Sequence, residues 1–395
     1  MKLLRPKLIR ITTVPGSLRT LLKDQLKYMN QYFEVVAIAS PDENIEKDIR
    51  ENEGVRFIPV LMTRKISLLT DLKSLWKLYN IIRKERPAIV HTHTPKAGLL
   101  GMVASLLAGV PVRLHTVAGM PLLEANGFRR KLLDVVEKIT YICATKVYPN
   151  SFGLYDIILK NKYAPEKKLK VLGNGSSNGI DTSYFDPQLY ENFDTSEFKK
   201  NIGIENDDFV FIFIGRLVKD KGVNELIEAF ISLRRDYSKI KLLILGSFEA
   251  HLSPLKPEVV KEIETNESII YVGYQRDVRP YLLISNIFVF PSYREGFPNV
   301  VLQAGAMGIP SIVSDINGCN EIITDGLNGL IIPAKDQEIL RERMKSLMND
   351  NALRSQLSAK SREIIITKYQ RYKIFENLLQ EYNVFIEQRQ AQVYK

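Results

Sequence analysis

Residues 209–216 read FVFIFIGR, six consecutive apolar residues followed by a glycine and an arginine. A strand that is apolar on both of its faces suits the interior of a parallel sheet covered by helices on both sides. Residues 223–234 follow with apolar side chains at helical spacing. This stretch therefore predicts one strand–helix unit of an α/β sheet.

The same alternation extends in both directions from this unit. Further strands are expected over 8–13, 35–39, 55–60, 88–92, 112–117 and 146–149, and over 241–245, 269–272, 287–290, 311–313 and 330–332. Helical patterns lie between them, for example over 18–29, 68–84, 98–108, 129–142, 278–285, 300–307 and 336–348. The fold class is α/β, with parallel sheets built from βαβ units.

The chain has 395 residues, which is too long for one hydrophobic core and fits two. The segment 173–179, rich in Gly, Asn and Ser, is the best candidate linker. We predict two facing, doubly wound Rossmann-like domains, residues 1–180 and 181–370. Residues 371–395 are expected to form a C-terminal helix that crosses back to the first domain.

The net charge of +10 is unevenly distributed along the chain. Residues 1–180 hold 29 Lys and Arg against 15 Asp and Glu, a net charge of +14, whereas the rest of the chain carries −4. A net positive charge concentrated in one domain indicates an anionic partner such as nucleic acid, a membrane surface or a phosphorylated ligand. Solubility alone is the alternative explanation.

The cysteines and the apolar segments exclude several classes of protein. Cys143 and Cys319 lie far apart with no Cys/His cluster near them, so we expect neither a disulfide framework nor a zinc site. The apolar segment 97–112 is shorter than the roughly 20 residues that a membrane span needs. The N-terminus lacks a signal-peptide pattern, and a cytoplasmic protein is expected.

Ligands of such sheets bind beyond the carboxyl ends of the strands, so the loops there hold the candidate site. Gly16 follows the first strand, where a glycine lets backbone N–H groups approach an anion; an ordinary tight turn is the alternative. Arg216 and Lys221 follow the strand at 209–214, and their charges suit a diphosphate. A solvated turn is the alternative here.

The loop after the strand at 287–290 carries the most specific motif, PSYREGFPNVVLQAGAMGIP over 291–310. Glu295 supplies a carboxylate, and Pro298 occupies a position typical of the first turn of a helix. The start of that helix directs free N–H groups at the loop, and Gln303 lies about one turn further on. A carboxylate, amides and a polar side chain thus converge where a phosphorylated sugar would bind.

This motif resembles the family-4 retaining glycosyltransferases of the GT-B fold, and within them the bacterial capsule and O-antigen sugar transferases. The resemblance covers essentially the whole chain. Besides the Glu295 block, it includes Gly215-Arg216 with Lys221-Gly222, the run NGID at 178–181, the run NEIITDGLNG at 320–329, and HTH at 91–93 with His115.

The resemblance implies a role for each matching residue. Glu295 would contact hydroxyls of the donor sugar and the charge developing at its anomeric carbon, and His115 would lie near the sugar ring. The residues that the resemblance predicts to hold the donor diphosphate are Arg216, Lys221, Phe297, Pro298, Asn299 and Val300. Gly16 is expected to help through its backbone amides, on the basis of its strand-to-helix turn alone. Gln303 replaces the usual family Glu, and it retains an acceptor for the nucleotide ribose while losing the charge.

Other positions follow from placement alone. Tyr274 is expected near the nucleobase, and His93 and Lys96 are candidate acceptor contacts in the basic first domain. His91, His93, His115 and His251 lack metal-ligand spacing, and no Asp-x-Asp is placed to bind Mg²⁺, so no metal or other cofactor is expected. A histidine at a strand end is also often a satisfied structural residue, and that alternative stays open.

Basic residues flank apolar ones at two places in the first domain, which is typical of attachment to an anionic leaflet. The membrane candidates are Trp76, Lys77, Phe128, Arg129, Arg130 and Lys131. Burial of the apolar members in an ordinary helix is the alternative, and we expect Trp76 and Phe128 to be exposed.

The predicted activity is sugar transfer from a nucleotide-sugar, UDP-linked, to a polyprenyl-diphosphate-linked saccharide at the inner face of the membrane. One alternative is a UDP-sugar 2-epimerase, which has the same architecture and needs no lipid. A basic nucleic-acid-binding protein is the other, but the sequence has no aromatic-stacking module or groove-reading helix. No nucleic-acid partner is therefore expected.

Overall fold

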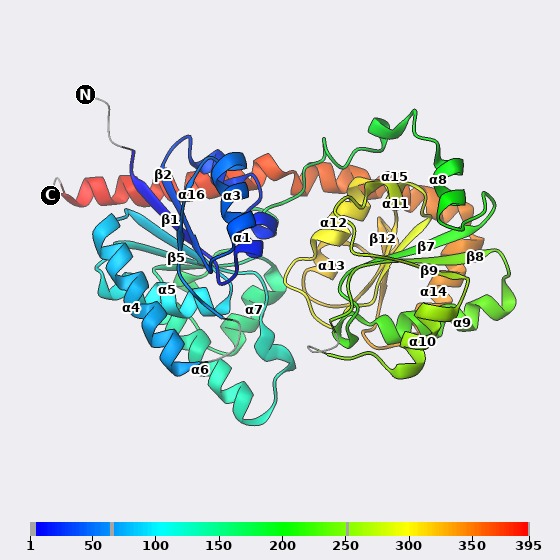
Figure 1. The fold of residues 1–395 in the computed structure, drawn as a ribbon, viewed down its shortest axis with the longest axis horizontal. Coiled ribbons are helices and arrows are strands. Elements are labelled where there is room, and N and C mark those ends of the chain that lie inside the picture. Colours follow the sequence, from blue (N-terminus) through cyan, green and yellow to red (C-terminus); the bar gives the residue numbers. More distant parts are fainter. Residues whose placement is uncertain (1–4, 64–66, 250–252, 394–395) are drawn as a thin grey trace. The chain divides into compact units, whose positions relative to one another are not determined.

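The structure is a computed structural model that describes residues 5–63, 67–249 and 253–393. The chain divides into two compact units (Figure 1). Unit 1 consists of Met1–Asn178 and Arg371–Lys395, and unit 2 is Gly179–Gln370. The sequence places the first boundary after residue 180, and the structure divides the chain two residues earlier.

Unit 1 contains a six-stranded, fully parallel sheet with the order β3-β2-β1-β4-β5-β6. Its strands are β1 Lys7–Ile11, β2 Glu34–Ala39, β3 Arg56–Pro59, β4 Ile89–His93, β5 Val112–Val117 and β6 Lys146–Pro149. The strand order reverses between β1 and β4, which is the position where doubly wound sheets bind ligands.

Helices cover both faces of this sheet. One face packs against α4 Leu68–Glu85, α5 Pro95–Leu107, α6 Gly127–Cys143 and α7 Phe152–Lys160. The other packs against α1 Pro15–Leu21, α2 Gln25–Met29, α3 Glu43–Asn52 and the C-terminal helix α16 Arg371–Val393. Short 3₁₀ turns, η1 Pro121–Glu124 and η2 Glu166–Lys168, complete the unit.

Helix α16 is an integral part of unit 1, although 192 residues of unit 2 precede it in the chain. Tyr382 is fully buried, and its hydroxyl lies 2.6 Å from His91 Nδ1 on β4. Glu381 accepts a hydrogen bond from Tyr148 at the end of β6 and pairs with Lys170. The helix thus closes one face of the sheet with both apolar and polar contacts.

Unit 2 repeats the topology of unit 1. Its parallel sheet has the order β12-β11-β10-β7-β8-β9, which reverses between β7 and β10. The strands are β7 Phe209–Ile214, β8 Ile240–Leu245, β9 Ile269–Gly273, β10 Ile287–Phe290, β11 Ser311–Ser314 and β12 Gly329–Ile332. The predicted fold class is confirmed by these two sheets.

The helices of unit 2 follow its strands. They are α8 Thr195–Asn201, α9 Val223–Asp236, α10 Pro257–Thr265, α11 Arg279–Leu283, α12 Asn299–Ala306, α13 Cys319–Ile322, α14 Gln337–Asn349 and α15 Asn351–Tyr369, with the 3₁₀ turns η3 Pro187–Tyr190 and η4 Lys219–Lys221. Their apolar faces and the strands form one continuous core. Phe211, Phe213 and Phe288 are completely buried in it.

The predicted helix over 18–29 is in fact two helices. The break is at Asp24, which has a left-handed backbone with φ 63°. The Glu53 carboxylate stabilises the break because it accepts hydrogen bonds from the N–H groups of Asp24 (2.6 Å) and Lys27 (2.8 Å). A capping group 26 to 29 residues away cannot be recognised from local periodicity.

Candidate active site

Glu295 lies in the loop between β10 and α12, and one of its two carboxylate oxygens is held by neighbouring side chains. Oε1 pairs with Lys221 Nζ and accepts a hydrogen bond from Ser292 Oγ at 2.8 Å. Oε2 has no hydrogen-bond partner among the described residues. The Glu295 and Lys221 side chains are 15% and 16% exposed. One carboxylate oxygen is therefore anchored, while the other can accept a hydrogen bond from a ligand.

Two glycines allow the neighbouring loops to approach this position. A Cβ on Gly222 would lie 2.0 Å from the carbonyl oxygen of Pro291, and its φ of +70° favours glycine. A Cβ on Gly318 would lie 2.3 Å from the carbonyl oxygen of Gly296, again at positive φ. The turn that carries Lys221 and the start of α13 thus contact the Glu295 loop directly.

Asp220 links the Lys221 turn to the Glu295 loop. Its carboxylate pairs with Arg294 at 3.0 Å and accepts a hydrogen bond from Ser253 at 3.0 Å, and its carbonyl accepts the Tyr293 N–H at 2.9 Å. Partial burial acts to raise the Asp220 pKa, but the bonds from Ser253 and Arg294 outweigh it, so the pKa is lowered. Asp220 is thus an ionised structural partner that fixes the position of Lys221.

A cavity of about 280 Å³ opens at the carboxyl ends of β7 and β8. Arg216 and Tyr274 both line it, so the structure brings together the residues predicted for the diphosphate and the nucleobase. Arg216 pairs with Glu249 at 3.2 Å and is 44% exposed, while Tyr274 is 71% exposed. Glu249 could not be predicted from the sequence, because nothing in the local sequence marks a partner 33 residues from Arg216.

The start of α12 differs slightly from the prediction. Pro298 is the residue that caps the helix rather than its first residue, and its carbonyl accepts the Val301 N–H at 3.1 Å. The N–H groups of Asn299 and Val300 have no partner among the described residues, as is usual for the first turn. Phe297 is buried against Tyr369, with ring centroids 5.4 Å apart, so only its backbone is available to a ligand.

Gln303 lies in the second turn of α12 and is partly buried. No hydrogen bond of its side-chain amide occurs within the described part of the chain. Gly16 is the second residue of α1 in unit 1, and a Cβ there would meet no atom within 4 Å. Packing therefore does not require a glycine at position 16, and its predicted role at the diphosphate stays a prediction.

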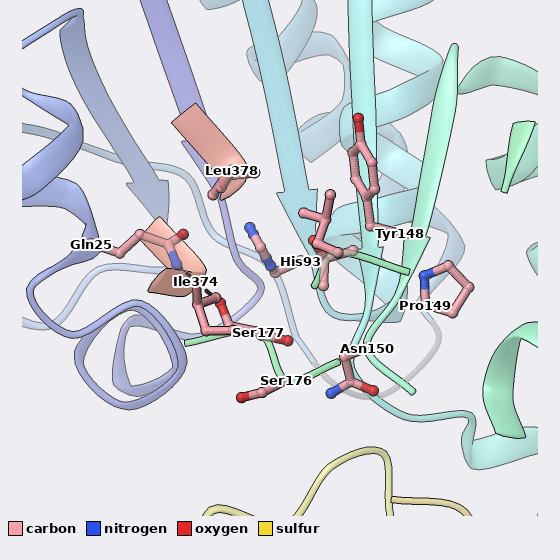
Figure 2. A pocket seen from close by; sticks show the side chains of 11 residues that line it. Gln25, His93, Tyr148, Pro149, Asn150, Ser176, Ser177, Ile374 and Leu378 are labelled. Carbon is pink, nitrogen blue, oxygen red and sulfur yellow. Dashed lines mark hydrogen bonds between the residues drawn. The ribbon is translucent and has the colours of Figure 1, made fainter. Parts of the chain in front are cut away.

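A second polar site lies in unit 1 at the carboxyl edge of its sheet (Figure 2). It is a cavity of about 20 Å³, room for a water molecule or one hydroxyl group. Its lining residues come from α2, from the ends of β4, β5 and β6, from the loop at 172–177 and from α16; they are Gln25, His93, Thr116, Tyr148, Pro149, Asn150, Leu172, Ser176, Ser177, Ile374 and Leu378.

The protonation of His93 follows from its neighbour Arg10. Arg10 is fully buried, and its Nη2 lies 2.7 Å from His93 Nε2 and 2.5 Å from Gln25 Oε1. A guanidinium only donates, so His93 Nε2 must accept and the ring proton is on Nδ1. Burial, with a smaller effect of Arg10, lowers the His93 pKa well below its usual value.

Several buried polar atoms around this cavity lack partners. Among the described residues, His93 Nδ1, Asn150 Oδ1, Ser177 Oγ and two nitrogens of Arg10 form no hydrogen bond. Unpaired buried polar groups are costly and usually bind water or a ligand. Donors and acceptors are both present, which is suitable for a hydroxyl group.

His115 and Lys96 occupy different environments from those predicted. His115 is 2% exposed inside the sheet–helix core, where its Nδ1 lies 2.8 Å from Thr92 Oγ1 and its ring packs against Tyr141. Burial lowers the His115 pKa to about 4. Lys96 pairs with Asp71 at 2.8 Å. The catalytic role of His115 stays a prediction, and its enclosed ring favours the structural alternative.

Comparison with known proteins identifies the family. The family described as glycosyl transferases group 1 matches residues 194–364, and the glycosyl transferase 4-like domain matches residues 25–175. A capsular polysaccharide biosynthesis glycosyltransferase, CapM of Staphylococcus aureus, is 34% identical over 98% of this chain and 99% of its own length. The chain therefore belongs to the glycosyltransferase family that these two domain models describe, and it is a glycosyltransferase.

Two further similarities agree with that assignment. The UDP-Gal:alpha-D-GlcNAc-diphosphoundecaprenol alpha-1,3-galactosyltransferase of Escherichia coli is 31% identical over 82% of each chain. A crystal structure of a glycosyltransferase from Rickettsia africae has a TM-score of 0.78, with 19% identity over 97% of this chain and 99% of that one. The fold is GT-B.

We predict that the contribution of His115 to stability depends on pH. The folded pKa of about 4 lies below the ordinary value of 6.5, so the unfolded chain binds a proton that the folded chain does not between these limits. The stability advantage of the wild type over His115→Gln should shrink as pH falls from 6.5 toward 4, by up to about 1.4 kcal/mol per pH unit. Urea unfolding at several pH values measures it; a difference that is constant with pH contradicts the prediction.

Proposed function

We propose that this glycosyltransferase transfers a sugar, with retention of anomeric configuration, from a UDP-sugar to a polyprenyl-diphosphate-linked saccharide in surface polysaccharide biosynthesis. The observation that carries the proposal is the Glu295–Lys221 pair beside the β7–β10 switch point, with one carboxylate oxygen unpaired among the described residues. Ligand sites in doubly wound sheets lie at such switch points.

The proposed donor chemistry is electrostatic. Departure of the nucleotide diphosphate leaves positive charge on the sugar ring and adds negative charge to the phosphate. Lys221, Arg216 and the free N–H groups at the start of α12 stabilise the phosphate charge, and Arg216 exchanges Glu249 for the diphosphate. The Glu295 carboxylate accepts hydrogen bonds from sugar hydroxyls and stabilises the positive charge. No metal ion is needed in this scheme.

The UDP-linked donor and the lipid-linked acceptor are supported by the name of the Escherichia coli relative, which states both UDP-galactose and diphosphoundecaprenol. The net charge of +14 in residues 1–180 suits an acceptor diphosphate and an anionic membrane. The polar cavity next to His93 suits one hydroxyl of the acceptor saccharide. We therefore propose that unit 1 binds the acceptor and that the enzyme attaches peripherally to the inner face of the membrane.

The family assignment leaves the UDP-sugar 2-epimerase alternative without support, because the relatives that are 34% and 31% identical to this chain are glycosyltransferases. An epimerase would convert a UDP-sugar with no acceptor present. The absence of a nucleic-acid partner stays a prediction, and a mobility-shift assay with RNA and DNA at physiological salt tests it.

Glu295→Gln keeps the size of the side chain and removes its charge, so we expect a loss of transfer of at least 100-fold with nearly unchanged donor binding. Lys221→Met should instead weaken donor binding, because a cation next to the diphosphate is lost. Nucleotide release with an undecaprenyl-diphosphate-linked saccharide and titration with UDP measure the two effects. Near-normal transfer by Glu295→Gln would overturn the assignment of Glu295.

Metal independence gives a second prediction for the donor site. If Lys221, Arg216 and the α12 amides neutralise the diphosphate, transfer in the presence of EDTA should equal transfer with added Mg²⁺. The comparison uses the same nucleotide-release assay at constant ionic strength. A rate that falls with EDTA and returns with Mg²⁺ or Mn²⁺ contradicts the proposed scheme.

The His93 cavity predicts a selective effect on the acceptor. His93→Gln removes the ring N–H at Nδ1 but leaves an acceptor for Arg10, so the KM for the acceptor should rise several-fold while the donor KM stays unchanged. His115→Gln is the matched control, because the His115 ring is as buried as that of His93 but bonds Thr92, and neither His115 nor Thr92 lines the cavity. Equal effects of both variants on the acceptor KM would indicate a structural role.

A further inference from the structure

The outer surface of α4, α5 and α6 in unit 1 is unusually apolar. These helices cover one face of the first sheet, and their outward side chains include large exposed apolar residues: Leu68, Leu69, Leu72 and Trp76 on α4, Leu106 and Leu107 on α5, and Phe128, Val135, Ile139 and Ile142 on α6. Trp76 is 66% and Phe128 83% exposed, which confirms the expected exposure of both. Exposed apolar side chains gathered in this way mark interaction sites.

A groove lies between α4 and the end of α5 on this surface. It has a volume of about 460 Å³ and is lined by Leu72, Leu75, Trp76, Tyr79 and Leu107. The rings of Trp76 and Tyr79 stack with centroids 6.0 Å apart. Every lining side chain is apolar or aromatic, so the groove offers no hydrogen-bonding pattern for a polar ligand apart from the Tyr79 hydroxyl.

The charges around the apolar residues are positive. Lys73 and Lys77 on α4 and Arg129, Lys131 and Lys138 on α6 are exposed and form no ion pair within the described residues. The acidic residues of the same helices are already engaged or buried: Asp71 pairs with Lys96, Glu85 with Lys7 and Arg56, and Asp134 with Arg130, while Glu137 is buried. The membrane candidate Arg130 is therefore held by Asp134, unlike its neighbours Arg129 and Lys131.

We propose that this α4–α6 surface docks on an anionic lipid bilayer. Trp76 and Phe128 enter the interface, and Lys73, Lys77, Arg129 and Lys131 contact the lipid phosphates, since long basic side chains extend from an apolar surface to a charged layer. A second copy of the chain is a poor occupant, because two such surfaces would bring like charges together. None of the described helices is long and apolar enough to cross a bilayer.

The biological purpose of this surface rests on the proposed lipid-linked acceptor, but its binding can be measured separately. The probe is a set of phosphatidylcholine vesicles with 0, 20 or 40% phosphatidylglycerol, without donor or acceptor, in a flotation assay. We expect binding that rises with phosphatidylglycerol and falls with salt. The double variants Trp76→Ser with Phe128→Ser and Lys73→Gln with Lys77→Gln should each weaken binding at least tenfold.

Matched controls separate docking from general changes in the protein. Leu189→Ser removes a 62% exposed leucine of unit 2, and Lys47→Gln removes a charge from α3 on the opposite face of the sheet; both should bind vesicles normally. Thermal unfolding of all variants verifies that they fold. Glu295→Gln should also bind normally, so a failed transfer assay does not affect this test.

Three results would overturn the proposal. Undiminished vesicle binding by both double variants would place the contact elsewhere, and binding without dependence on phosphatidylglycerol would exclude the role of the lysines. Dimerisation of the wild type that is abolished by Trp76→Ser with Phe128→Ser, in the absence of vesicle binding, would assign the surface to a second copy.

Discussion

Burial of both faces of each parallel sheet is the constraint on which the arrangement of this protein depends. The central strands β1, β4, β7 and β10 are covered by helices on both sides, so their interior positions are mostly occupied by apolar side chains. Loops at the carboxyl edges are then the natural place for groups that need solvent or ligand. Glu295, Lys221 and Arg216 lie in such loops in unit 2, and the His93 cavity occupies the equivalent edge in unit 1.

The ion pairs of Lys221 and Arg216 bear directly on the proposed binding of a nucleotide-sugar. Lys221 and Arg216 are paired with Glu295 and Glu249, so neither cation is left uncompensated without ligand. A buried charge that loses its partner is strongly destabilising, which applies to the Lys221–Glu295 pair, whereas the more exposed Arg216–Glu249 pair separates at little cost. In the proposed reaction the diphosphate replaces Glu249 as the partner of Arg216, while Lys221 contacts the diphosphate and still holds Glu295 Oε1. For Arg216, binding is thus an exchange of partners rather than the filling of an empty charged site.

The sequence predicted both sheets, the two-unit division and the loops that carry Glu295, Lys221 and Arg216, because strand periodicity and the Glu295 motif are local patterns. It did not predict contacts between residues distant in the chain, such as Arg216 with Glu249 or Asp24 with Glu53. Nor did it predict that β5 turns His115 into the core, against Gly98 and Tyr141. The direction of one side chain on a strand depends on which helix covers each face, and composition does not specify this.

The position of α16 has a consequence for synthesis of the chain. Unit 1 receives Leu378, Glu381 and Tyr382 from α16, so the part of the sheet face that α16 covers beside α1, α2 and α3 stays uncovered while all of unit 2 is translated. Unit 2 is continuous in sequence and can fold as soon as it leaves the ribosome. Unit 1 is therefore completed only after unit 2 has been synthesised, and a ribosome that stops before α16 releases a chain in which this face of the unit 1 sheet is only partly covered.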